Sequence, residues 1–256
     1  MTYDNNINNQ TICIDIGNSR MKIFDGNKLI KSISNKVDLE IELMNYLCNS
    51  MPEKVIYSSV NKASENILKD VLFRLKIKYL SANELINKFT DIDFSNVPAM
   101  GIDRRLGLIA AYTTAKCPLI TVDFGTCITI NVIDEKAICL GGNIYPGLQT
   151  QANALYYYTG ALPQLRISYT DEIIGKETNI AMQSAIIDIS LEGLNAHILK
   201  IKKKYFENKE VNIIFTGGIS VISKLHKYDF KYKVDELLVL KGMWVLSKYF
   251  FDSDEA

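Results

Sequence analysis

A short pattern that occurs twice, in residues 12–24 and again in residues 120–132, is the strongest constraint on the fold of this chain. In each copy, β-branched residues lead into Asp-x-Gly, a small polar residue follows, and alternating apolar residues complete a strand–turn–strand pattern. A pattern that appears once in each half predicts two related α/β domains, residues 1–118 and 119–256, with a cleft between them.

The rest of the sequence alternates helical and extended patterns, as expected for α/β domains. Asp38 and Ser81 are each expected to cap a helix, and residues 91–100 are expected to be irregular. The periodicity predicts further helices over 63–75, 103–115, 148–158, 176–203 and 243–250, and strands over 54–58, 137–140 and 211–215.

Composition excludes several classes of function. Lys and Arg number 29 against 29 Asp and Glu, so nothing in the charge favours nucleic acid or an anionic membrane. No apolar run approaches the roughly 20 residues that span a bilayer, and residues 1–10 lack the features of a signal peptide. Five scattered cysteines without a Cys-x-x-Cys pair predict reduced thiols and a cytoplasmic protein, and the two histidines lack metal-ligand spacing.

The Asp-x-Gly loops carry the first candidate chemistry. Gly17, between Asp15 and small polar residues, allows backbone N–H groups and the Ser19 hydroxyl to approach a phosphate. Asp15 can hold hydrated Mg²⁺ beside that phosphate. An ordinary hairpin turn is the alternative for one copy, but a purely structural hairpin does not need the second acid at Asp123.

Two further clusters have both a chemical and a structural interpretation. The sequence Thr216-Gly217-Gly218 ends a strand and opens a helix, which suits the flat adenosine moiety, although turn glycines of this kind are common. Asp103 can accept a proton from an attacking hydroxyl, and Arg104 can bind a carboxylate or phosphate with its forked guanidinium. Alternatively, Asp103 caps the helix that follows and Arg104 is solvated.

The motifs in their order along the chain resemble the type III pantothenate kinases, and the resemblance extends from about residue 11 to about residue 250. The matching segments are Asp15-Ile16-Gly17-Asn18-Ser19, Gly101-Ile102-Asp103-Arg104, Asp123-Phe124-Gly125-Thr126, Gly141-Gly142-Asn143-Ile144-Tyr145-Pro146-Gly147, Gly175-Lys176-Glu177-Thr178, Ala181-Met182-Gln183-Ser184 and Thr216-Gly217-Gly218.

The resemblance implies two duplicated ribonuclease H-like domains of the actin/hexokinase ATPase type. It also implies ATP-dependent phosphorylation of pantothenate, the first step of coenzyme A biosynthesis, by a homodimer that uses Mg²⁺ and a monovalent cation such as K⁺ or NH₄⁺. It makes Asp103 the catalytic base, Asp123 the ligand of the monovalent cation and Asp15 the water-mediated ligand of Mg²⁺. The implied ATP-binding residues are Asp15, Ile16, Gly17, Asn18, Ser19, Arg20, Met21, Lys22, Thr126, Gly217 and Gly218, and the implied pantothenate-binding residues are Phe94, Gly101, Ile102, Asp103, Arg104 and Thr178.

A few positions depart from the family pattern. Phe94 stands where the family often has tyrosine, Ser19 where Thr is commoner, and Val97 follows Asn96 where proline is usual. Two other functions remain open from the sequence: a kinase for a different small hydroxylated acid or sugar on the same fold, and a nucleotide-binding regulator without turnover. Measuring ADP release with and without pantothenate separates these three.

Overall fold

The computed structural model describes residues 11–17, 20–34, 38–115, 117–207, 209–218 and 226–251. Within these residues the chain forms two compact units. The first comprises the described parts of Met1–Asp91, Met100–Ala110 and Val239–Ala256, and the second those of Ile92–Ala99 and Ala111–Leu238. These units divide the chain differently from the predicted halves, because residues 239–251 fold with the first unit.

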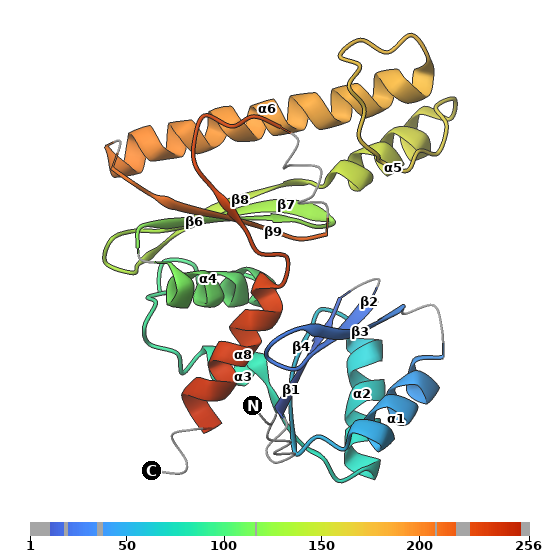
Figure 1. Ribbon diagram of the computed structural model, residues 1–256, viewed down its shortest axis with the longest axis vertical. Coiled ribbons are helices and arrows are strands. Elements are labelled where there is room, and N and C mark those ends of the chain that lie inside the picture. The colour runs from blue at the N-terminus through green and yellow to red at the C-terminus, as the bar shows by residue number, and fades with distance from the viewer. Residues whose placement is uncertain are drawn as a thin grey trace, which may run out of the picture. The chain divides into compact units, whose positions relative to one another are not determined.

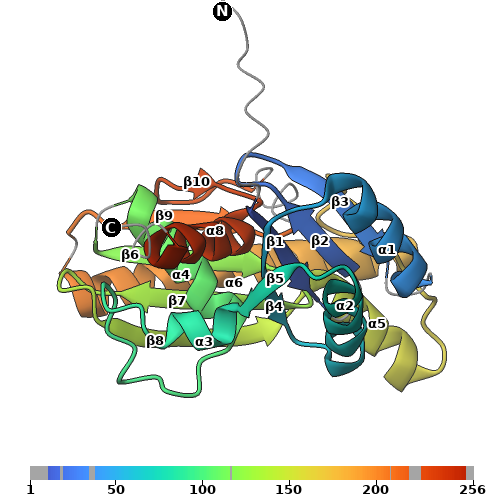
Figure 2. The same ribbon diagram turned by 90° about the horizontal axis from the view of Figure 1, so that it is seen from below.

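The first unit is built on a five-stranded sheet in the order β3-β2-β1-β4-β5 (Figure 2). Its strands are β1 (Thr11–Ile16), β2 (Arg20–Phe24), β3 (Leu29–Ser34), β4 (Lys54–Ser59) and β5 (Lys78–Ser81). Strands β1, β2 and β3 are antiparallel, whereas β4 and β5 run parallel to β1. The sequence predicted the hairpin of β1 and β2 but not β3.

Two helices cover one face of this sheet (Figure 1). In α1 (Leu39–Ser50), Leu39, Leu43 and Leu47 recur every four residues and form the buried stripe, while the Asp38 side chain accepts a hydrogen bond from the backbone N–H of Ile41, as predicted. Helix α2 (Lys62–Arg74) packs its buried residues into the same core, together with the apolar side chains of β1. The short helix α3 (Ala82–Ile86) follows β5 and is capped by Ser81.

Helices α4 (Ile102–Thr114) and α8 (Leu238–Phe251) complete the first unit, which contains residues 102–110 of α4 and 239–251 of α8. The Trp244 ring covers Gly26 and meets Phe24 edge-on at a centroid separation of 6.5 Å. At Gly242 the backbone of α8 approaches Leu106 so closely that a Cβ atom would overlap the Leu106 carbonyl oxygen. Helix α8 therefore packs both on the end of β2 with the turn that follows it and on the helix that carries Asp103.

The second unit repeats the topology of the first. Its sheet has the order β10-β9-β6-β7-β8, so that β6, β7, β8, β9 and β10 correspond in turn to β1 through β5. The strands are β6 (Leu119–Phe124), β7 (Cys127–Ile133), β8 (Cys139–Pro146), β9 (Asn212–Thr216) and β10 (Lys233–Val234). The predicted duplication of an α/β fold is thereby confirmed.

Helix α6 (Thr178–Phe206) runs along one face of the second sheet (Figure 1). Helix α5 (Leu148–Thr159) begins where β8 ends, and its buried residues Leu148 and Ala152 join the same core. The predicted strand over residues 137–140 ended too early: β8 continues through Gly141 and Gly142 and pairs with β7 as far as Pro146. Among the described helices none is both long and apolar enough to cross a membrane.

Candidate active site

The first acidic loop lies at the end of β1. Asp15 and Ile16 close the strand, Gly17 donates its backbone N–H to the carbonyl oxygen of Arg20 at 2.9 Å, and β2 follows. Asn18 and Ser19 lie outside the described residues. Of the predicted ATP-binding side chains, those of Ile16 and Met21 are fully buried in the core, so these two residues can offer a ligand only their backbone groups.

Asp15 is a half-buried carboxylate between two neighbouring strands. Ser58 on β4 donates its hydroxyl to Oδ1 of Asp15 at 2.7 Å, and Lys22 is the register partner of Asp15 on β2. Burial raises the pKa of the Asp15 carboxyl above its ordinary value, while the Ser58 hydrogen bond and the Lys22 charge lower the pKa. The negative charge of Asp103, which belongs to the same unit, also raises the pKa of Asp15.

Asp103 lies in the first turn of α4 with an exposed side chain. The Gly101 carbonyl oxygen accepts the backbone N–H of Arg105 at 3.2 Å, so Gly101, not Asp103, occupies the N-cap position. The Asp103 carboxylate accepts the N–H of Arg104 at 2.9 Å, and a Cβ atom at Gly101 would lie 2.8 Å from its Oδ1 atom. Glycine at position 101 therefore makes room for the acid, and the N-cap interpretation of Asp103 was wrong.

The second acidic loop joins β6 to β7. Gly125 donates its N–H to the carbonyl oxygen of Cys127 at 3.0 Å, and the Thr126 carbonyl accepts both the Gly147 N–H at 2.9 Å and the Thr150 hydroxyl at 2.7 Å. A Cβ atom at Gly147 would overlap the Gly125 carbonyl oxygen. The start of α5 therefore holds this loop in place and leaves Thr126 exposed.

The predicted adenosine motif meets this same loop. Strand β9 runs parallel to β6 with Thr216 in register with Asp123. Gly217 follows at a φ of +95°, and a Cβ atom there would lie 2.5 Å from Asp123 Oδ1 and 2.6 Å from the Phe124 carbonyl oxygen. The structure thus brings together two motifs that are far apart in the sequence, and it leaves Gly218 open on the surface.

The predicted pantothenate-binding residues divide between the two units. Gly101, Ile102, Asp103 and Arg104 belong to the first unit, and Phe94 and Thr178 to the second. Phe94 is half-buried in the segment 92–99, where the neighbouring Asp93 pairs with Ile138 as an isolated parallel bridge. Thr178 is exposed as the first residue of α6.

The donor groups suit metals that are bound largely by water and phosphate. Within the described ranges no group of three or more His, Cys, Asp and Glu side chains could enclose a metal ion. Asp15 can supply one carboxylate to Mg²⁺, which usually keeps several waters and binds substrate phosphates. The Asp123 carboxylate and the Phe124 carbonyl oxygen both lie close to Gly217, and oxygen atoms of this kind suit a monovalent cation.

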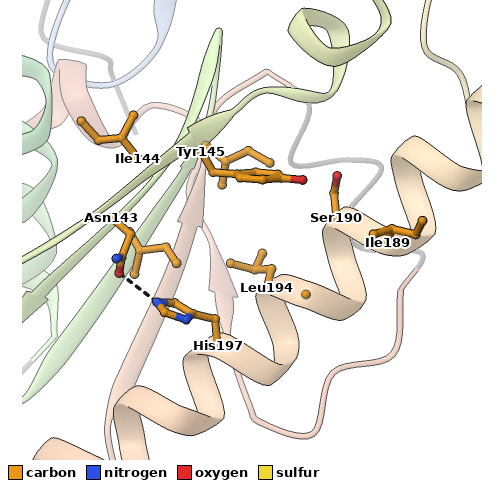
Figure 3. Close-up of a pocket in the computed structure, with 10 residues that line it drawn as sticks. Asn143, Ile144, Tyr145, Ile189, Ser190, Leu194 and His197 are labelled. Carbon is orange, nitrogen blue, oxygen red and sulfur yellow. Dashed lines mark hydrogen bonds between the residues drawn. The ribbon is translucent and has the colours of Figure 1, made fainter. Parts of the chain in front are cut away.

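A separate cavity of about 460 Å³ lies in the second unit between β7, β8 and α6 (Figure 3). Its wall is mostly apolar, with Ile144 and Ile189 exposed, and His197 Nε2 lies 3.0 Å from Asn143 Oδ1. None of the predicted site residues lines this cavity. The sequence analysis missed it because its wall combines strand and helix residues that are about 50 positions apart.

The repeated sheets and their Asp-x-Gly hairpins define the class: the duplicated α/β fold of the actin/hexokinase-type ATPases. Two solved structures share this fold over 94% of the chain. One is a Campylobacter jejuni protein assigned to the Baf family of transcriptional activators, with a TM-score of 0.60 and 21% identity over 99% of its length. The other, from Sinorhizobium meliloti, is assigned as a 2-dehydro-3-deoxygalactonokinase, with a TM-score of 0.58 and 10% identity over 97% of its length.

The sequence comparison is more specific. A family model described as type III pantothenate kinase matches residues 11–198. Type III pantothenate kinases from Thermosipho melanesiensis and Finegoldia magna are 33% and 31% identical to this chain, covering 94% and 92% of it and 98% and 96% of their own lengths. The chain belongs to the type III pantothenate kinase family, and the resemblance described above is confirmed.

Proposed function

We propose that this protein transfers the γ-phosphoryl group of ATP to pantothenate, forming 4'-phosphopantothenate in the first step of coenzyme A biosynthesis. Family membership over most of the chain identifies the reaction. The observation that carries the assignment to a site is that Asp15, in the first phosphate loop, and Asp103, the exposed acid of α4, belong to the same compact unit. The first acidic loop and the candidate general base are therefore parts of one compact unit.

The chemistry requires little beyond positioning and charge. The primary hydroxyl oxygen of pantothenate forms a bond to the γ-phosphorus, the bond from that phosphorus to the β–γ bridging oxygen breaks, and ADP leaves. Asp103 accepts the hydroxyl proton, a role that is worth roughly 10²- to 10⁴-fold in rate. Arg104 follows Asp103 on α4 and offers a guanidinium to an anionic oxygen of either substrate.

We assign ATP binding to the two acidic loops and to the glycines after β9. The residues are Asp15 to Lys22 of the first loop, Thr126 of the second, and Gly217 with Gly218. Bound Mg²⁺ and a monovalent cation, K⁺ or NH₄⁺, would neutralise phosphate charge beside Asp15 and Asp123 respectively. The chain itself would supply backbone N–H groups to the phosphates, and the Gly147–Thr126 hydrogen bond holds the second loop against the start of α5.

The acceptor side of the site is assigned to Gly101, Ile102, Arg104, Phe94 and Thr178. Phe94 has no phenol, so its contribution to pantothenate binding is apolar contact. We further propose that the protein acts as a homodimer in the cytoplasm. We also propose that the two duplicated domains are residues 1–118 and 119–256, and that α8, although part of the second domain in sequence, packs with the first unit.

Coupled measurement of ADP release tests the proposal directly. The protein should release ADP in proportion to added pantothenate and require Mg²⁺, with product identified by mass as the phosphate ester. ADP release with a sugar or another hydroxylated acid but not with pantothenate would replace the substrate. Tight ATP binding without turnover on any of these acceptors would identify a nucleotide-binding regulator.

A further inference from the structure

Each unit places a buried hydroxyl in register with the aspartate of its Asp-x-Gly hairpin. On the parallel neighbour of β1, Ser58 is paired with Asp15, and on the parallel neighbour of β6, Thr216 is paired with Asp123. Ser58 is 2% exposed and Thr216 is 3% exposed. Because residues in register on adjacent strands project to the same face, the duplication preserves a hydroxyl beside the acid as well as the acid itself.

In the first unit this hydroxyl makes a short hydrogen bond. The 2.7 Å separation between Ser58 Oγ and Asp15 Oδ1 is typical of a hydroxyl donating to a carboxylate, which is stronger than a bond between neutral groups. Ser58 engages Oδ1, so Oδ2 is the carboxylate oxygen that this hydrogen bond does not use. The bond also restricts rotation of a carboxylate that burial already disfavours in its charged form.

We propose that Ser58 is a positioning residue of this kinase, whose hydroxyl holds the Asp15 carboxylate in the orientation that receives the divalent cation of MgATP. This inference rests on the proposed function for the identity of the nucleotide. Partners that orient a metal ligand in this way usually change metal affinity or activity by 10- to 100-fold when they are removed. A simpler role, in which Ser58 only satisfies a buried acid, would affect stability and not the cation.

Nucleotide binding without pantothenate separates the two roles. Isothermal titration calorimetry with ATP gives one dissociation constant in the presence of Mg²⁺ and another in the presence of EDTA. The ratio of the EDTA value to the Mg²⁺ value measures how much the cation contributes to ATP binding. For Ser58→Ala we expect this ratio to fall at least about 10-fold, while Mg²⁺-free ATP binding changes little. Ser58→Thr keeps the hydroxyl and should restore the ratio.

The matched control is Ser247→Ala. Ser247 is as buried as Ser58, at 2% exposure, and donates its hydroxyl at 2.7 Å to the Trp244 carbonyl within α8. Its removal should cost similar stability and leave the cation contribution unchanged. If Ser58→Ala does not fold, Ser58→Cys preserves the shape with a weaker donor and should show the same direction of change.

A ratio for the folded Ser58 variant equal to those of the wild type and Ser247→Ala would overturn the proposal, as would a wild type whose ATP affinity is indifferent to Mg²⁺. These outcomes do not depend on the acceptor. If the wild type releases no ADP with pantothenate yet shows the expected ratios, the proposed function fails and the role of Ser58 stands.

Discussion

Replacing Gly217 by alanine probes the contact between the adenosine motif and the second acidic loop. Gly217 has a φ of +95°, which an L-residue adopts at a cost of about 1–2 kcal/mol. The new Cβ atom would also lie 2.6 Å from the Phe124 carbonyl oxygen, 0.8 Å inside the 3.4 Å at which ordinary contact begins. Asp123 can move its side chain away, but the backbone of Phe124 cannot yield as easily.

Overpacking of this kind costs about 1–3 kcal/mol, and the reduced freedom of the unfolded chain returns about 0.4–1 kcal/mol. We therefore expect Gly217→Ala to lower the free energy of unfolding by about 2–4 kcal/mol. For a chain of this size that corresponds to a decrease in Tm of roughly 5–15 °C. Because the displaced oxygens border the proposed nucleotide and cation sites, ATP affinity should fall as well.

Gly160→Ala is the matched control. Gly160 also has a positive φ, of +66°, but no atom lies within 4 Å of the position that a Cβ atom would take. Gly160→Ala should lower the free energy of unfolding by no more than about 1.6 kcal/mol and keep its ATP affinity. Thermal melts and ATP titrations on both variants give the comparison. Equal losses of Tm and unchanged ATP binding in both would refute the argument that Gly217 is required for close approach.

Three further predictions concern charge and reactivity. Burial raises the pKa of Asp15, so its charge costs stability at pH values above the folded-state pKa. Asp15→Asn should therefore raise the free energy of unfolding at pH 8, and urea melts should show this gain shrinking as the pH falls toward 3.8. Replacing K⁺ by Na⁺ should lower turnover of the wild type markedly and leave Asp123→Asn indifferent, whereas equal sensitivity would remove Asp123 from the cation site. Iodoacetamide should label the exposed Cys48 and Cys127 but not Cys13, because burial raises the pKa of the Cys13 thiol. Peptide mass spectrometry should show that MgATP slows the labelling of Cys127 alone.

Much of the fold was predictable from the sequence because local residue patterns determine many of its helices and strands. The repeated strand–turn–strand segments are the hairpins β1–β2 and β6–β7, and the predicted helices and strands over 63–75, 148–158 and 211–215 agree with the structure within a few residues. Capping by Asp38 was also confirmed, since an N-cap depends on residues that are adjacent in sequence.

The features that sequence did not reveal depend on long-range packing. Strand β3 was not predicted. The predicted strand at residues 137–140 ended too early, because Gly141 and Gly142 of β8 are held in the sheet by pairing with β7, and the local sequence pattern does not encode this pairing. The position of α8 follows from the contacts of Gly242 and Trp244 with residues more than 130 positions away.

In the candidate site, too, the local motifs were predictable from sequence and the long-range contacts were not. Asp15 and Asp123 lie near the ends of predicted strands and Asp103 at the start of a predicted helix, but the N-cap alternative for Asp103 could be excluded only from the Gly101–Arg105 hydrogen bond. The role of Ser58 depends on the register of β1 with β4, which joins residues 43 positions apart. Register between distant strands is a tertiary property, and no short motif signals it.

The most direct test of the account is the turnover of Asp103→Asn with pantothenate. Asparagine keeps the size of the side chain but cannot take the proton, so ADP release should fall by about 10²-fold or more while MgATP affinity and Tm stay close to those of the wild type. Asp38→Asn, at the N-cap of α1 in the same unit, is the control and should retain full turnover. Near-normal, pantothenate-dependent turnover of Asp103→Asn would contradict the assignment of Asp103 as the catalytic base.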